Sequence, residues 1–189
     1  MHPMKRLLDL VVCLVLAAPA TLAVLVVLPI VAIETRATPL FRQRRVGRGE
    51  RPFTLLKLRT MRADTPDGAS HDIGAATITR SGRFLRRSKI DELPQLWNVL
   101  MGDMSLVGPR PCLPSQTELV AARRVLGVDA LRPGITGPAQ VMGLDMSDPP
   151  RLAQVDASYL GRFSLGRDLT LLIQTAMGRG SGDAAAIRR

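Results

Sequence analysis

The stretch LVVCLVLAAPATLAVLVVLPIVAI, residues 10–33, contains no charged side chain. As a straight helix it would be about 36 Å long, which is enough to cross the hydrocarbon core of a bilayer. A transmembrane anchor is therefore the simplest interpretation. A secretory signal fits less well, because Asp9 interrupts the start of the run and the run continues well past the small residues at 17–20.

The residues in and around this run favour a third interpretation, a helix that enters the membrane and returns to the same face. Pro19 lies inside the run, where proline removes a helix hydrogen bond and bends the helix, and Pro29 follows nearer its end. Both flanks are basic: Lys5 and Arg6 precede the run, and six arginines follow it between residues 36 and 51. The positive-inside rule places both flanks in the cytoplasm, as a re-entrant helix kinked at Pro19 requires.

Composition limits the function classes. The net charge is +10 and the sequence pI is about 11.2, so the partner is expected to be anionic: nucleic acid, an anionic bilayer face or a phosphorylated substrate. Aromatic residues make up 3%, too few for a base-stacking platform, which argues against nucleic acid. Two cysteines and two histidines argue against a disulfide framework, a zinc site or a histidine-based triad. Any chemistry must therefore use carboxylates, arginine and lysine.

The rest of the chain predicts a mainly helical α+β domain with a small β-hairpin. Two short runs, Pro39–Val46 and Pro52–Leu58, are separated by a glycine-containing turn, which is typical of a hairpin. Helical spacing follows over residues 88–101, 114–126, 153–160 and 165–177, the last with Leu169, Leu172, Ile173 and Ala176 on one stripe. A polar stretch over 63–76 predicts a mobile loop. We therefore expect a membrane segment at 1–36, a cytoplasmic domain at 37–178 and a disordered tail at 179–189.

The pair Asp91-Glu92 is the strongest candidate for chemistry. Pro94 lacks an N–H donor and suits the first turn of a helix, which places both carboxylates near that helix's N-terminus. One interpretation is structural: Asp91 is an ordinary N-cap residue that accepts a hydrogen bond from the helix backbone. The functional interpretation is a carboxylate nucleophile that attacks phosphorus, with an adjacent carboxylate able to hold Mg²⁺. Leu96 and Trp97, a few residues on, are expected in the core.

Several cations could complement such a site by binding phosphate. Arg110 stands between two prolines and Arg132 precedes Pro133-Gly134, so both guanidiniums project from rigid loops. Lys57 and Arg59 alternate along a strand and should share one face. For each of these residues, and for Arg86, a solvated surface charge is the alternative.

Six strings in this order resemble the bacterial sugar transferase family, the small monotopic phosphoglycosyl transferases. They are KRLLD from residue 5, LFRQRRVG from residue 40, KLRTM from residue 57, DELPQLWNVL from residue 91, GDMSLVGPRP from residue 102 and RPGITG from residue 132. The resemblance runs from about residue 4 to residue 175. Its two central strings are specific enough to favour the nucleophile over the N-cap at Asp91.

The resemblance implies a re-entrant membrane helix and a ping-pong reaction with Mg²⁺. Asp91 would attack the β-phosphorus of a UDP-sugar, UMP would leave, and polyprenyl (undecaprenyl) phosphate would take the phosphosugar from the aspartyl intermediate. Glu92 would hold Mg²⁺ together with Asp91 or assist Asp91. Arg110 falls in the family's Pro-Arg-Pro motif and Arg86 matches a recurrent family arginine, so both should bind phosphate.

The resemblance also implies a location and partners. The enzyme would lie on the bacterial inner membrane with its catalytic domain on the cytoplasmic face. Its basic flanks would attract anionic lipid, with roughly 1 kcal/mol from each Lys or Arg near the surface. The product would begin the synthesis of a lipid-linked glycan: exopolysaccharide, capsule, O-antigen or glycoprotein glycan. A homodimer is compatible with this interpretation. The alternatives are a non-enzymatic scaffold, in which Asp91 and Glu92 are dispensable, and a hydrolase that uses the same aspartyl chemistry.

Overall fold

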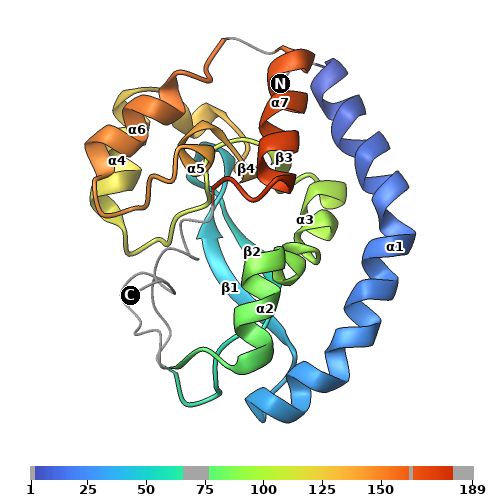
Figure 1. Cartoon of the computed structure of the whole chain (residues 1–189). Coiled ribbons are helices and arrows are strands. Elements are labelled where there is room, and N and C mark those ends of the chain that lie inside the picture. The colour runs from blue at the N-terminus through green and yellow to red at the C-terminus, as the bar shows by residue number, and fades with distance from the viewer. Residues whose placement is uncertain (1–2, 66–76, 162–163, 181–189) are drawn as a thin grey trace.

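The computed structural model describes residues 3–65, 77–161 and 164–180. Most of these residues are helical, as predicted, and they surround two small two-stranded sheets (Figure 1). The elements are, in order, α1 (Pro3–Thr35), β1 (Leu40–Val46), η1 (Arg48–Glu50), β2 (Pro52–Leu58), α2 (Arg80–Ser88), η3 (Ile90–Glu92), α3 (Gln95–Met101), β3 (Ser105–Val107), α4 (Thr117–Val125), η4 (Val128–Ala130), β4 (Gly134–Thr136), α5 (Pro138–Val141), α6 (Pro149–Ala157) and α7 (Leu165–Ala176). Most of the predicted mobile loop and of the predicted tail lies outside the described residues.

The apolar segment forms one unbroken helix, α1, that is bowed along one side of the molecule (Figure 1). Among the described residues it is the one helix long and apolar enough to cross a membrane. The helix continues through both Pro19 and Pro29, so the bend expected at Pro19 does not interrupt α1. An interior proline removes only one backbone hydrogen bond, and gentle curvature over many residues can accommodate it. Large apolar side chains are exposed along the outer side of α1: Leu7, Val11, Leu14, Val15, Leu16, Leu22, Leu25, Val26, Ile30 and Ile33.

Buried polar side chains fix the N-terminal part of α1 to the domain. Lys5 Nζ donates to Asp168 Oδ2 at 2.8 Å and to Tyr159 Oη at 2.9 Å. Asp9 Oδ1 accepts from Ser105 Oγ at 3.1 Å and from the backbone N–H of residue 106 at 3.0 Å. These contacts connect α1 to α7 and β3.

The C-terminal end of α1 is fixed to the same domain. The Glu34 carboxylate accepts from the backbone N–H groups of Arg80 and Ser81 at 3.0 and 2.9 Å, at the N-terminus of α2. A negative charge is favourable there because the first N–H groups of a helix have no partner within it. Both ends of α1 are therefore bound to one folded domain.

The predicted hairpin is confirmed. β1 and β2 pair antiparallel from Leu40 opposite Leu58 to Val46 opposite Pro52. Gly49, in the turn between them, has a φ of 61°, which glycine adopts at little cost. The amide of Asn98 on α3 binds the free edge of β2: its Oδ1 accepts from the N–H of residue 56 and its Nδ2 donates to the carbonyl of residue 54.

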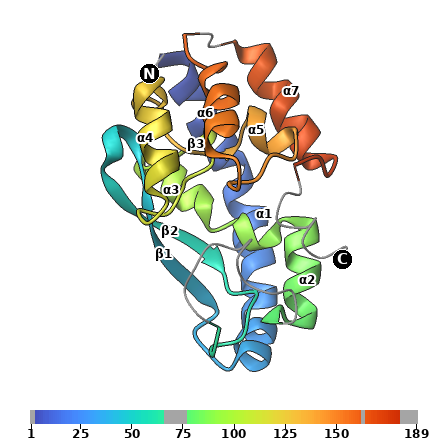
Figure 2. The same cartoon turned by 90° about the vertical axis from the view of Figure 1, so that its left-hand side faces the viewer.

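Three apolar clusters hold the domain together, and the third, Val31, Leu58 and Leu85, joins α1, β2 and α2. The first contains Leu55, Leu96, Val99, Met104, Leu106, Val107, Tyr159 and Leu171, with Cys13 of α1. The second contains Cys112, Leu119, Ala139 and Leu152 and lies under α4 and α6. Figures 1 and 2 show α4 and α6 side by side, at the end of the molecule away from α2.

Two predictions about the core were wrong. Leu96 is buried, but Trp97 is 58% exposed, because α3 begins only at Gln95 and presents Leu96 and Val99 to the core instead. On α7 three members of the predicted stripe, Leu169, Ile173 and Ala176, are exposed, and the fourth, Leu172, packs against the first cluster. Asp168 and Leu171 are the buried residues of α7. In α7 the polar contact of Asp168 with Lys5 therefore sets which face is inside.

Candidate active site

The two candidate carboxylates lie in a tight turn between α2 and α3, and not on one long helix as the spacing over 88–101 predicts. Lys89 ends α2 in the left-handed conformation, with a φ of 58° that is uncommon for a residue with a side chain. Ile90–Glu92 then form one 3-10 turn, and Pro94 occupies the N-cap position of α3. Asp91 is buried and Glu92 is partly buried. The expected position near the helix N-terminus is confirmed.

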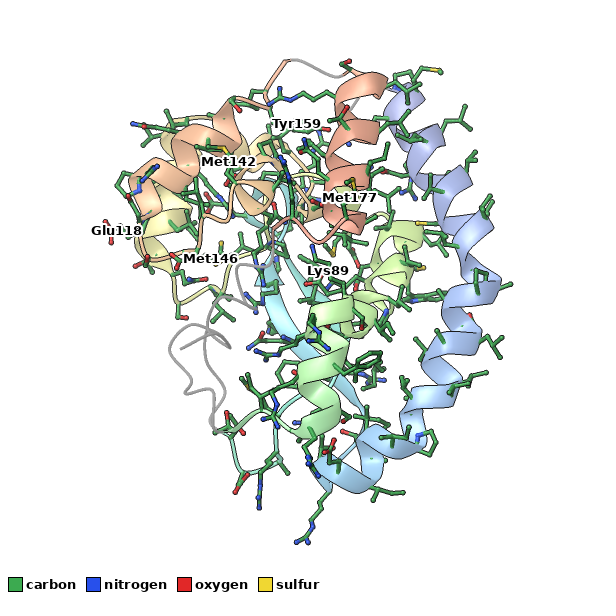
Figure 3. The ribbon with its side chains drawn as sticks, in the orientation of Figure 1. Lys89, Glu118, Met142, Met146, Tyr159 and Met177 are labelled. Carbon is green, nitrogen blue, oxygen red and sulfur yellow. The ribbon has the colours of Figure 1, made fainter. Side chains whose placement is uncertain are left out.

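Two cations lie within electrostatic reach of this turn. Burial lowers the pKa of Lys89, the positive charge of Arg110 lowers it further, and the negative charges of Glu92 and Asp91 oppose both effects. The charges of Asp91, Glu92 and Arg110 therefore all act on Lys89, although Arg110 is distant in sequence. Figure 3 shows Lys89 at the junction of α2 and α3.

Lys89 was not among the residues that the sequence predicted for the site. Its Nζ donates to the carbonyl oxygen of Arg179 at 3.0 Å, just beyond α7. A methyl group at Gly180 would lie 2.6 Å from the carbonyl oxygen of Gln140 on α5. The segment of Arg179 and Gly180 therefore passes close to Lys89, at the end of α2, and to α5. The one feature of the sequence that could have pointed to Lys89 is its position two residues before Asp91.

The loop that carries Arg110 is held by its backbone carbonyls. Arg123 Nη1 donates to the carbonyl of Arg110 at 2.9 Å, and Arg45 Nη1 donates to that of Pro111 at 3.1 Å. The carbonyl of Pro109 accepts from the N–H of residue 134 at 2.8 Å. These bonds and the two prolines give a rigid loop, as predicted, and a fixed origin for the Arg110 side chain.

The strand cations and Arg86 lie near the same turn. Lys57 on β2 and Arg59, one residue beyond its end, lie on the same side, as predicted: both pack over the ring of Phe41, at 5.4 and 5.2 Å from its centroid. β2 in turn packs against η3. Arg86 is buried, and its Nε donates to Thr60 Oγ1 at 2.9 Å, which connects α2 to the end of β2.

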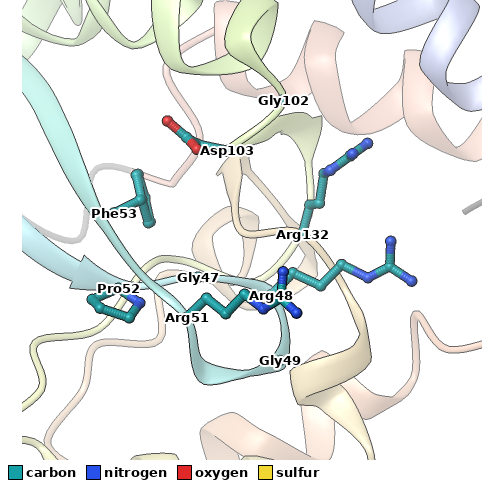
Figure 4. Close-up of a pocket in the computed structure, with 9 residues that line it drawn as sticks. All are labelled: Gly47, Arg48, Gly49, Arg51, Pro52, Phe53, Gly102, Asp103 and Arg132. Carbon is teal, nitrogen blue, oxygen red and sulfur yellow. The ribbon is translucent and has the colours of Figure 1, made fainter.

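Arg132 lies apart from this cluster. It lines a hollow of about 490 Å³ beside the hairpin turn, together with Arg48, Arg51 and Asp103 (Figure 4). Burial lowers the pKa of Arg132, and the charges of Arg6 and Arg48 lower it further. The strand that carries Lys57 and the helix that carries Arg86 therefore pack against the turn of Asp91, whereas Arg132 lies elsewhere.

The donor set at the turn suits magnesium. Mg²⁺ is usually held by one or two carboxylates together with substrate phosphates and water, and Asp91-Glu92 is such a pair. In the described part of the chain, no group of three or more His, Cys, Asp or Glu side chains could hold a metal ion without substrate. Cys112 is buried, and burial raises the pKa of its thiol, which makes a nucleophilic thiolate unfavourable.

Comparison with known proteins identifies the family. Residues 1–179 match the bacterial sugar transferase family. The chain is 43% identical over 181 residues to the UDP-glucose:undecaprenyl-phosphate glucose-1-phosphate transferase of Caulobacter vibrioides, a match that covers 90% of this chain and 67% of that protein.

Two further relatives agree. The chain is 36% identical over 176 residues to the uncharacterized sugar transferase EpsL of Bacillus subtilis, covering 91% of this chain and 85% of that protein. It is 34% identical over 183 residues to the UDP-N-acetylgalactosamine-undecaprenyl-phosphate N-acetylgalactosaminephosphotransferase of Aeromonas hydrophila, covering 90% and 42%. With its charged turn and rigid Pro-Arg-Pro loop, this chain belongs to the bacterial sugar transferase family.

Proposed function

We propose that this protein transfers a sugar phosphate from a UDP-sugar to polyprenyl (undecaprenyl) phosphate, releasing UMP. The observation that carries the proposal is the buried Asp91 beside Glu92, in a tight turn within reach of Lys89 and Arg110. The names of the relatives support a UDP-sugar donor and an undecaprenyl phosphate acceptor. The product is a polyprenyl diphosphate sugar, the starting unit of a lipid-linked glycan.

In the first half-reaction, one carboxylate oxygen of Asp91 attacks the β-phosphorus of the donor. The bond between that phosphorus and the bridging oxygen breaks, UMP leaves, and an acyl phosphate joins the sugar phosphate to Asp91. In the second half-reaction, a phosphate oxygen of the lipid attacks the same phosphorus and the Asp91 carboxylate is released. Atoms and charges balance without any further reactant.

The neighbouring side chains stabilise the charge that moves during these steps. Arg110, on its rigid loop, and Lys89, in its fixed turn, bind the phosphate oxygens. Glu92 and Asp91 would hold Mg²⁺, which when bound neutralises the diphosphate of the donor. Lys57, Arg59 and Arg86 add positive charge along the neighbouring strand and helix, which favours binding of two anionic substrates.

The position of α1 supports a monotopic arrangement, in which the protein enters one leaflet and returns. A helix of 33 residues is roughly 50 Å long, yet Lys5 near one end and Glu34 near the other bind the same domain. A helix that crossed the bilayer would place these ends on opposite sides. Together with the basic flanks, this supports a catalytic domain on the cytoplasmic face of the inner membrane.

The test is UMP release by the purified protein in nanodiscs, with Mg²⁺, undecaprenyl phosphate and a panel of UDP-sugars. Wild type should release UMP with at least one donor, and Asp91→Asn should lower the rate by more than about a thousandfold because the nucleophile is lost. Glu118→Gln is the control, since Glu118 is exposed on α4, far from Lys89 (Figure 3). That variant should keep wild-type activity.

Other outcomes would contradict the proposal. No release with any donor, from folded protein and a competent lipid, would favour a scaffold. Release that continues without the lipid at the same rate, turnover after turnover, would indicate a hydrolase. Release that persists in Asp91→Asn would exclude Asp91 as the nucleophile.

A further inference from the structure

The hollow beside the hairpin turn is the strongest feature that the proposed reaction does not use. Arg48, Arg51 and Arg132 line it, and Asp103 is the one acidic residue that does so among the described residues (Figure 4). Its volume of about 490 Å³ is large enough for a phosphorylated headgroup. A cavity with such an excess of guanidinium groups favours an anionic ligand.

A fourth arginine approaches the same place from α1. A methyl group at Gly102 would lie 3.7 Å from Nη2 of Arg132 and 3.8 Å from Nη2 of Arg6, so these two guanidiniums meet over one glycine. Arg6 is held there because it donates to the carbonyls of residues 99 and 100, at 2.6 and 2.9 Å, at the C-terminus of α3. Like charges gathered in this way repel each other, and an anion bound between them would remove the repulsion.

The hollow is separate from the charged turn. α3 lies between them: Asp91 precedes its first residue and Gly102 follows its last, and seven residues of helix are roughly 10 Å long. The charges that act on Arg132 are those of Arg6, Arg48, Asp9 and Asp103, whereas those that act on Lys89 are Glu92, Arg110 and Asp91. The two sets share no residue.

We propose that this hollow is a second phosphate-binding site, lined by Arg48, Arg51 and Arg132 with Arg6 beside it, which binds a phosphate ester away from the reacting atoms. The headgroup of an acidic phospholipid is the expected source. Arg6 belongs to the apolar helix α1, and two neighbours of the hollow in sequence, Leu7 and Met101, are 54% and 65% exposed. Basic residues next to exposed apolar side chains are the combination that binds an anionic headgroup at a membrane surface.

The test measures binding to the full-length protein in a neutral detergent. Native mass spectrometry follows a titration with phosphatidylglycerol, and calorimetry follows sn-glycerol 1-phosphate, the soluble form of the same phosphate ester. Arg48→Gln/Arg51→Gln is the test variant. Arg42→Gln/Arg44→Gln is the control, because it removes the same charge from exposed positions of β1 that do not line the hollow.

The test variant should bind phosphatidylglycerol about 30-fold more weakly than wild type, from a factor of roughly five for each arginine near an anionic surface. The control should bind as wild type does. If glycerol phosphate binds as tightly as the lipid and with the same dependence on Arg48 and Arg51, the site is supported and its ligand is soluble. Equal losses in the two double variants would overturn the proposal.

A further variant separates this inference from the proposed reaction. Asp91→Asn should bind phosphatidylglycerol as tightly as wild type, because the hollow contains no residue of the Asp91 turn. If Asp91→Asn removed lipid binding, the two sites would not be separate and the proposal would fail, whatever the variant did to UMP release.

Discussion

Arg123 connects α4, α6 and the loop that carries Arg110, and replacing it by methionine should be strongly destabilising. Its Nε and Nη2 donate to Asp156 Oδ2 at 3.0 and 2.7 Å, and its Nη1 donates to the carbonyl of Arg110. The side chains of Arg123 and Asp156 are 9% and 0% exposed. Methionine fills most of the same volume but leaves the Asp156 carboxylate buried without its cation.

The expected loss is about 3–5 kcal/mol, the usual result of removing one partner from a buried ion pair. Burial raises the pKa of Asp156 and the charge of Arg123 opposes that effect, so the pKa should rise further in Arg123→Met. A carboxyl with a raised pKa in the folded state binds a proton on folding. Its favourable contribution to the free energy of unfolding is fully present below the ordinary pKa of 3.8 and is lost as the pH rises through the raised pKa of the folded state. The loss should therefore be larger at pH 7 than at pH 5.

The assay is urea unfolding followed by far-UV circular dichroism in a neutral detergent, at pH 5 and at pH 7. Arg124→Met is the matched control, because Arg124 is the next residue on α4 and its partner Glu50 is at the surface. That variant should unfold almost as wild type does. A loss in Arg123→Met no larger than in the control, or one that is equal at both pH values, would refute the argument.

Three further predictions test other contacts. Lys5→Met should cost about 3 kcal/mol or more in the same assay, because Asp168 is fully buried, and Lys5→Met/Asp168→Asn should cost less than the two single variants together. Gly82→Ala should lower the melting temperature by several degrees, since its Cβ would lie 2.2 Å from the carbonyl oxygen of Thr60; an unchanged melting temperature would show that α2 moves freely. Lys89→Gln should lower kcat about 10- to 100-fold with an unchanged dichroism spectrum, and an unchanged kcat would exclude Lys89 from the reaction.

Local patterns were enough to predict several parts of the fold. The hairpin follows from two short runs around a glycine turn, which are adjacent in sequence. The position of Asp91 and Glu92 at the start of α3 follows from Pro94, which lacks an N–H donor. The shared face of Lys57 and Arg59 follows from the alternation of side chains along a strand.

The features that could not be predicted depend on packing between distant segments. The apolar spacing over residues 88–101 predicts one helix, but Lys89 is left-handed and α3 begins only at Gln95. The face that α3 turns to the core, and with it the exposure of Trp97, could therefore not be inferred. The grouping of Arg132 with Arg6 and Arg48 requires α1, the hairpin turn and β4 to meet. The contacts that fix both ends of the bowed α1 to one domain also join residues distant in sequence, so they could not be inferred from Pro19 alone.

The most direct test of the central claim is to look for the sugar phosphate on Asp91. Wild-type protein is incubated with an active UDP-sugar and Mg²⁺ but without lipid acceptor, and then analysed as intact protein and as peptides by mass spectrometry. The account predicts one sugar phosphate on the peptide that contains Asp91, its loss when undecaprenyl phosphate is added, and no adduct in Asp91→Asn. An adduct on another residue, or UMP release by Asp91→Asn at the wild-type rate, would contradict it.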